Sequence, residues 1–96
     1  MNTTINSVKF RADEKLERFI QDKVSKLDRM IDNAVRCEVT LKVDKPESDN
    51  NKIAELRIIV PGKDLFVTKQ ADTFEQAVLD CIDALRPQIE KYKERR

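Results

Sequence analysis

Apolar and polar residues alternate along the middle of the chain, the period-two pattern of strands with one buried face. The apolar positions of this pattern are Cys37, Val39, Leu41 and Val43, followed by Ala54, Leu56, Ile58 and Val60. A polar segment at residues 45–51 separates the two runs, and Pro61-Gly62 marks a tight turn after the second. We therefore predict four strands, at residues 5–10, 36–44, 54–60 and 65–70.

Two other segments carry apolar residues at helical spacing. Their apolar positions are Leu16, Phe19, Ile20, Val24, Leu27, Met30 and Ile31, and then Phe74, Val78, Cys81, Ile82, Leu85, Ile89 and Tyr92. Asp13 can cap the first helix, and Asp72 with Glu75 forms a capping-box pattern at the start of the second. Pro87 lacks a backbone N–H, so we expect a kink there and non-helical geometry at Arg86.

The predicted order is βαβββα, which places the chain in the α+β class. Both helices have one apolar face, so a four-stranded mixed sheet with the two helices packed on one side would bury those faces together. We expect residues 1–96 to form a single domain.

Composition excludes several classes of protein. Apolar residues make up 40% and charged residues 39% of the chain, which argues against disorder. We find neither a membrane-length apolar run nor a secretory signal, so we expect a cytoplasmic protein. With no histidine and one glycine, nucleotide-binding loops and the usual catalytic groups are missing. We expect no enzyme activity, no cofactor and no metal, and we interpret Cys37 and Cys81 as core thiols.

The formal net charge of +1 does not by itself indicate a nucleic-acid binder. At about 100° per residue, however, four bases of the first helix fall within about 80°; they are Lys15, Arg18, Lys26 and Arg29. The second helix is acidic at its start and basic at its end, where Arg86, Lys91, Lys93, Arg95 and Arg96 lie. These patterns fit phosphate binding, and they fit equally a solvated surface and a complemented helix dipole.

Three segments resemble a known family. In the first predicted helix, the matching residues are Leu16-Glu17-Arg18-Phe19-Ile20, Lys23 and Lys26-Leu27. In the second predicted strand, they are Val39-Thr40-Leu41-Lys42-Val43. In the last helix they are Phe74, Ala77-Val78, Ile82-Asp83, Leu85, Gln88-Ile89 and Lys91-Tyr92-Lys93. Over residues 5–93 the chain resembles the hibernation-promoting factors and ribosome-associated inhibitors, also called sigma-54 modulation proteins.

The resemblance implies a protein that is monomeric when free and binds ribosomal RNA at the decoding region of the small ribosomal subunit. There it would block messenger and transfer RNA and inactivate idle ribosomes, without a membrane or a small-molecule substrate. The implied RNA-binding residues are Lys15, Arg18, Lys23, Lys26, Arg29, Arg86, Lys91, Lys93 and Arg95. Ala84 and Pro87 stand where the family usually has bases. Long relatives add a C-terminal dimerisation domain, absent after Arg96, so we do not expect the protein to pair ribosomes by itself, although it could act beside another dimerising factor.

Two other functions stay open at this point. One is a protein-interaction module that modulates a transcription factor such as sigma-54, which the near-neutral net charge favours. The other is a binder of double-stranded RNA, which would read a duplex by its shape. Phe66 is the one aromatic ring expected to face outward from a strand, where it could stack on a base or pack at an edge.

Overall fold

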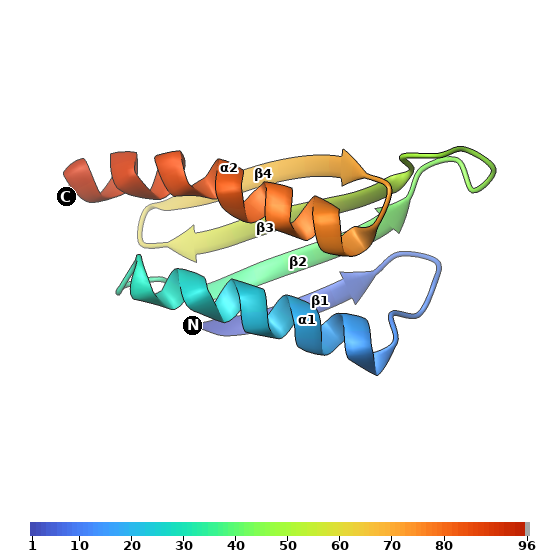
Figure 1. Ribbon diagram of the computed structural model, residues 1–96. Helices are drawn as coiled ribbons and strands as arrows, with labels where there is room; N and C mark the ends of the chain where they lie inside the picture. Colours follow the sequence, from blue (N-terminus) through green and yellow to red (C-terminus); the bar gives the residue numbers. More distant parts are fainter. Residues whose placement is uncertain (96) are drawn as a thin grey trace.

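The computed structural model describes residues 1–95, which form one sheet covered on one face by helices (Figure 1). The elements in chain order are β1 (Asn2–Ser7), α1 (Glu14–Ser25), the 3₁₀ helix η1 (Lys26–Arg29), β2 (Arg36–Val43), β3 (Lys52–Val60), β4 (Lys63–Ala71) and α2 (Phe74–Glu94). The predicted order βαβββα and the α+β class are confirmed.

The strands lie in the sheet in the order β1-β2-β3-β4. β1 pairs with β2 in parallel, with Ile5 opposite Val39. The other two pairs are antiparallel, and Leu56 faces Val39 on one side and Val67 on the other. Figure 1 shows α1 and α2 side by side over the same face of this sheet. The predicted mixed sheet with both helices on one face is therefore confirmed.

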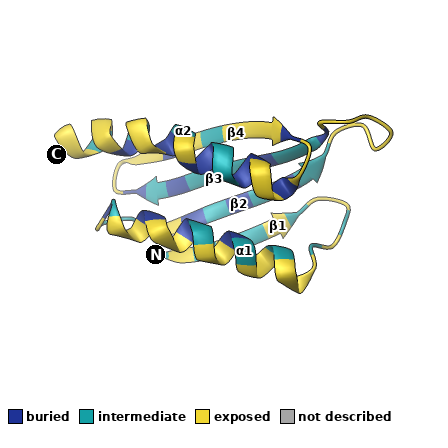
Figure 2. Ribbon diagram, viewed as in Figure 1, coloured by how far each residue is buried: buried dark blue, intermediate teal, exposed yellow. Residues whose placement is uncertain are grey.

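The core lies between the sheet and the helices, as the burial colours in Figure 2 show. Alternate residues of β2 and β3 point into it, and Leu41, Leu56 and Ile58 are fully buried. From the helices, Ile20 and Leu85 are fully buried against them. The alternation seen in the sequence thus separates a dry face under the helices from an outer face in solvent.

The first strand lies earlier than predicted: it covers residues 2–7 and not 5–10. The last ladder bond runs from the Val8 N–H to the Leu41 carbonyl at 2.9 Å. Lys9 then takes a left-handed conformation with a φ of 62°, which ends the extended chain. Phe10 leaves the sheet and stacks on Phe74 at the start of α2, with ring centroids 5.0 Å apart. Phe10, which we expected in a strand, therefore packs a loop against the start of α2.

The cap of α2 is Thr73 and not the predicted Asp72. The Thr73 hydroxyl accepts a hydrogen bond from the Gln76 N–H at 3.0 Å. The Asp72 carboxylate instead accepts from the Asn50 N–H at 2.8 Å and so anchors the turn between β2 and β3. Both residue types cap helices well, and position alone decides between neighbours. The predicted Asp13 cap of α1 is confirmed, with the Leu16 N–H donating at 2.8 Å.

Helix α2 continues through Pro87, and Arg86 is helical, contrary to the sequence expectation. Tertiary packing explains why. Leu85 and Ile89 are fully buried on either side of the proline, which itself is exposed. Further on, the Asn33 side-chain amide donates a hydrogen bond to the Tyr92 hydroxyl at 2.7 Å. The end of α2 is therefore held against the molecule, and the basic residues after Pro87 stay on the helix.

We expect Leu56→Ala to lower the free energy of unfolding by about 2–5 kcal/mol, because it leaves a cavity in a site with no exposure. The matched variant Ile59→Ala alters the outer face of the same strand and should cost much less. Urea unfolding of both variants measures the difference. Equal losses would contradict a core confined to the helix side of the sheet.

Candidate nucleic-acid interface

The nine bases predicted from the sequence to contact RNA all lie in the helix layer. Eight of them are exposed, and Lys23 is half-buried. Helical repeat places these residues on the outside of the layer because the apolar stripes of both helices face the sheet. The structure then divides the nine bases into groups that the sequence did not separate.

The central group borders a groove between α1 and α2. Lys23 on α1, Lys26 on η1 and Arg86 on α2 line a hollow of about 220 Å³. The Arg86 guanidinium lies 3.7 Å from the Asp83 carboxylate and 3.6 Å from the Met30 sulfur. Bases from opposite ends of the chain therefore share one site, which neither helix could form alone.

A second group lies where α2 passes the end of η1. Arg29 and Lys93 line a smaller hollow of about 130 Å³, together with Asp32. The hydrogen bond between Asn33 and Tyr92 joins the residues next to Asp32 and Lys93 and fixes this contact. The packing of α2 beyond Pro87 is therefore what brings Lys93 beside Arg29.

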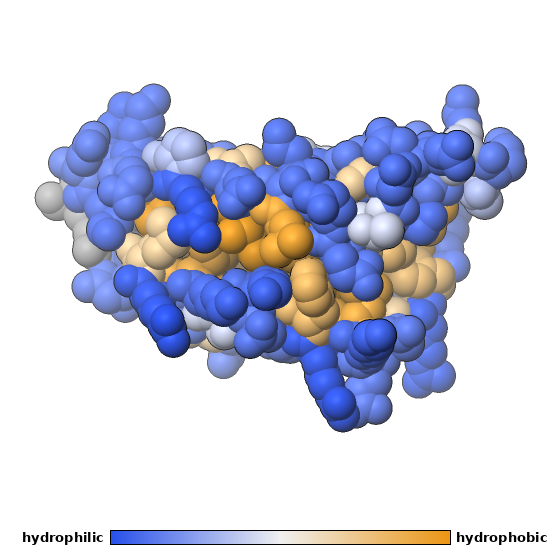
Figure 3. Space-filling view, viewed as in Figure 1, coloured by the Kyte–Doolittle hydropathy of each residue, from blue (hydrophilic) through white to orange (hydrophobic). Residues whose placement is uncertain are grey.

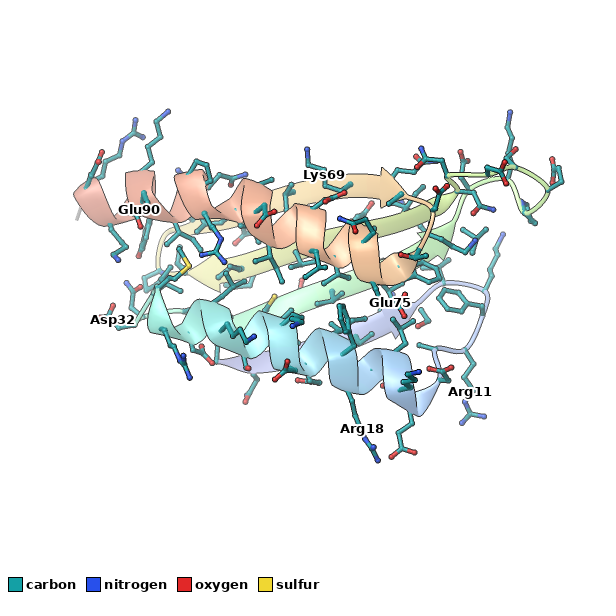
Figure 4. All side chains as sticks on the ribbon, in the orientation of Figure 1. Arg11, Arg18, Asp32, Lys69, Glu75 and Glu90 are labelled. Atoms are coloured by element: carbon teal, nitrogen blue, oxygen red, sulfur yellow. The ribbon has the colours of Figure 1, made fainter. Side chains whose placement is uncertain are left out.

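The remaining bases lie away from both hollows. Lys15 and Arg18 are on the first turns of α1, and Arg18 forms an exposed ion pair with Glu14. Figure 4 shows the Arg18 side chain pointing away from α2. Lys91 and Arg95 are exposed at the end of α2, and Arg96 lies outside the described residues. The predicted stripe on the first helix is therefore uneven. At one end Arg18 pairs with Glu14, away from both hollows, and at the other end Lys26 and Arg29 lie beside bases of α2.

The outer face of the sheet differs from the helix layer because its charges pair within and between the strands. The ion pairs are Arg36–Glu38 at 2.9 Å, Lys42–Glu55 at 2.8 Å and Arg57–Asp64 at 2.9 Å. In contrast, six of the nine bases in the helix layer form no ion pair with any residue in the described range 1–95; they are Lys15, Lys26, Arg29, Lys91, Lys93 and Arg95. These six exposed bases over the helices can therefore form ion pairs with an external polyanion.

Phe66 faces outward as predicted and is 41% exposed. The Arg57 guanidinium lies 4.8 Å from the centre of its ring, a cation–π distance. Arg57 also bonds Asp64, so this cluster is already satisfied within the sheet. The ring is therefore a weaker candidate for stacking on a base than its exposure alone indicates.

The two cysteines are buried and free, as the sequence indicated. Burial raises the pKa of the Cys37 thiol from 9.0 to about 12, and burial likewise raises the pKa of Cys81 to about 12, because it disfavours the thiolate. The Cys81 thiol donates to the Ala54 carbonyl at 3.3 Å inside the core. Within residues 1–95 no cluster of three or more metal-ligating side chains occurs, and no helix there is suited to crossing a membrane.

The family described as Sigma 54 modulation protein / S30EA ribosomal protein has a sequence model that matches residues 3–96. The chain belongs to this family. The resemblance recognised in the sequence is thereby confirmed over almost its whole length.

Individual proteins similar to this S30EA family member share its fold at low sequence identity. A ribosome hibernation promoting factor of Acinetobacter guillouiae is 26% identical over 99 residues, covering 97% of this chain and 88% of the relative. A ribosomal subunit interface protein from Coxiella burnetii matches with TM-score 0.87 and 17% identity, over 98% of this chain and 99% of the other. The N-terminal domain of Thermus thermophilus Protein Y matches with TM-score 0.79 and 19% identity, over 96% and 99%. At such identities the structural matches establish the fold of this S30EA family member.

We expect the stability of this S30EA family member to fall as the pH rises from 9 to 12. The unfolded chain releases the thiol protons near 9.0, whereas the folded protein keeps them to about 12, so rising pH favours the unfolded state. The slope of the unfolding free energy against pH measures this effect. A Cys37→Ala/Cys81→Ala variant should show a flatter slope over the same range. Identical slopes would show that the thiols titrate normally in the folded protein.

Proposed function

We propose that this protein binds the small ribosomal subunit at its decoding region and keeps idle ribosomes inactive. It would contact ribosomal RNA through the helix layer and exclude messenger and transfer RNA from the volume it occupies. The family relationship supports this proposal, as do the names of the relatives, which refer to ribosome hibernation and to the ribosomal subunit interface. Its place of action would be the cytoplasm.

The observation that carries the proposal is that exposed bases lack ion-pair partners more often on the helices than on the outer face of the sheet. On the outer face of the sheet, Arg36, Lys42 and Arg57 each pair with an acid on the same strand or the next one. Bases on the helices stand mostly without such partners at exposed positions, so they can form ion pairs with an external polyanion. Contacts from Lys and Arg to backbone phosphates position a protein on RNA without reading its sequence.

The shape of the protein fits a mechanism of occlusion. The principal extents of the molecule are 45, 22 and 19 Å, so it is a rod about twice as long as it is wide. A body of this size can fill a channel, and inhibition by occupancy requires no chemical step. The mechanism therefore needs neither a catalytic residue nor a cofactor, and a monomer is sufficient for it.

We expect Lys26→Glu/Arg29→Glu to weaken binding to isolated small subunits by roughly tenfold or more, because contacts from a base to a phosphate are charge-assisted hydrogen bonds. Both residues are exposed, and both lie on η1, which directly follows α1. Co-sedimentation with purified subunits measures the affinity.

The control is Lys45→Glu/Lys63→Glu, which makes the same change in net charge at exposed positions outside the helices. It should bind as the wild type does. If both double variants lost affinity equally, net charge and not the helix layer would govern binding. Circular dichroism of each variant checks that the fold is retained.

A protein-interaction role remains the alternative, and the uncovered face of the sheet favours it. Ile59 is half-buried there, and Phe66 is 41% exposed. A protein partner docking on this face would be sensitive to Phe66→Ala and insensitive to reversal of Lys26 and Arg29. The same variants therefore separate the two functions.

A further inference from the structure

The groove between α1 and α2 has an apolar floor. On one side it is formed by Leu27 on η1 and by Met30 at the end of η1, and on the other side by Leu79 and Ile82 on α2. In the space-filling view of Figure 3 an apolar band runs between the two helices and is bordered by hydrophilic residues. Leu27 and Ile82 belong to the core, whereas Leu79 and Met30 are partly exposed. The core therefore reaches the surface in the middle of the helix layer.

The rim of this groove is positively charged. Lys23, Lys26 and Arg86 line it, and Asp83 is the one acid among its lining residues. Lys23 lies with its ammonium 5.5 Å from the centre of the Phe19 ring, which holds its stem along the apolar wall. Arg86 is held by Asp83 and Met30 on the opposite side, with 55% of its side chain exposed. Lysine and arginine side chains from both sides of the groove thus flank an apolar floor.

A floor and rim of this kind match a ligand that combines a flat, weakly polar ring with a phosphate. We propose that the groove accepts one unstacked nucleotide of single-stranded RNA, with its base on the apolar floor and its phosphate against Lys23, Lys26 and Arg86. This inference rests on the proposed function and adds a base-binding subsite to a surface otherwise limited to phosphate contacts. Bases splayed out of single strands bind in this way on apolar and guanidinium surfaces.

The size of the groove is suited to a single ring. Its volume is about 220 Å³. That is the space of roughly seven water molecules in the liquid, and a peptide helix or an RNA duplex is much wider. Methionine sulfur contacts aromatic rings favourably, and arginine stacks on planar groups, so Met30 and Arg86 provide suitable surfaces.

The first test separates the base from the phosphate. Methyl signals of Leu79, Ile82 and Met30 are followed by NMR while adenosine 5′-monophosphate or cytidine 5′-monophosphate is added. Ribose 5-phosphate, which carries the same phosphate without a base, is the control. We expect saturable shifts of these methyl groups with the nucleotides only. Equal shifts with ribose 5-phosphate, or none with the nucleotides, would overturn the proposal.

The second test uses a variant that keeps the charge of the rim. Leu79→Gln makes the floor polar and is well tolerated in a helix. It should weaken small-subunit binding by roughly tenfold, the loss expected when stacking on one base is removed. Val35→Gln makes the same kind of change at an exposed site outside the groove and should bind normally.

The outcomes distinguish this inference from the proposed function. If Leu79→Gln binds subunits as tightly as the wild type while Lys26→Glu/Arg29→Glu fails, the base subsite is wrong and the ribosomal function stands. If the wild type itself fails to bind subunits, the proposed function is wrong, and the mononucleotide titration still decides whether the groove binds a base.

Discussion

Packing of α2 against the sheet is the interaction on which the rest of the structure depends. Cys81, Leu85 and Ile89 of this helix are fully buried over β3 and β4. Beyond the core, the Gln88 side chain donates to the Phe66 carbonyl at 2.9 Å, and the Tyr92 hydroxyl accepts from Asn33. These contacts run on both sides of Pro87 and outweigh its local preference, so one continuous helix carries bases from the centre of the layer to its end.

The same packing explains the groove. The most apolar residues of both helices, such as Ile20 and Leu85, are fully buried in one core with the sheet. The side chains between them, including Phe19 and Leu79, are only partly covered. The partly covered side chains between the two helices therefore leave an apolar groove at the surface, and the bases beside it form its rim. A tighter contact between the helices would have closed this site.

The sequence predicted the fold well because the strands and helices show strong period-two and helical patterns around Leu41, Leu56 and Leu85. The prediction was wrong where two adjacent residues were equally suited to one role, or where contacts with distant residues outweighed a local preference. Asp72 and Thr73 both cap helices, and only the tertiary bond to Asn50 assigns Asp72 another role. Phe10 has strand propensity, yet its partner is Phe74, near the other end of the chain. Helical projection grouped the bases of α1 and η1 but could not show that Arg86 joins Lys23 and Lys26, because that depends on how α2 is placed beside them.

Binding of the unmodified protein to isolated small ribosomal subunits, with transfer RNA as competitor, tests the central claim most directly. Co-sedimentation at several salt concentrations should show saturable binding that weakens steeply as salt rises, because each phosphate contact releases counterions. Transfer RNA should displace the protein if both occupy the decoding region. Binding that transfer RNA does not oppose would contradict occlusion, and absence of binding at low salt would contradict the ribosomal function itself.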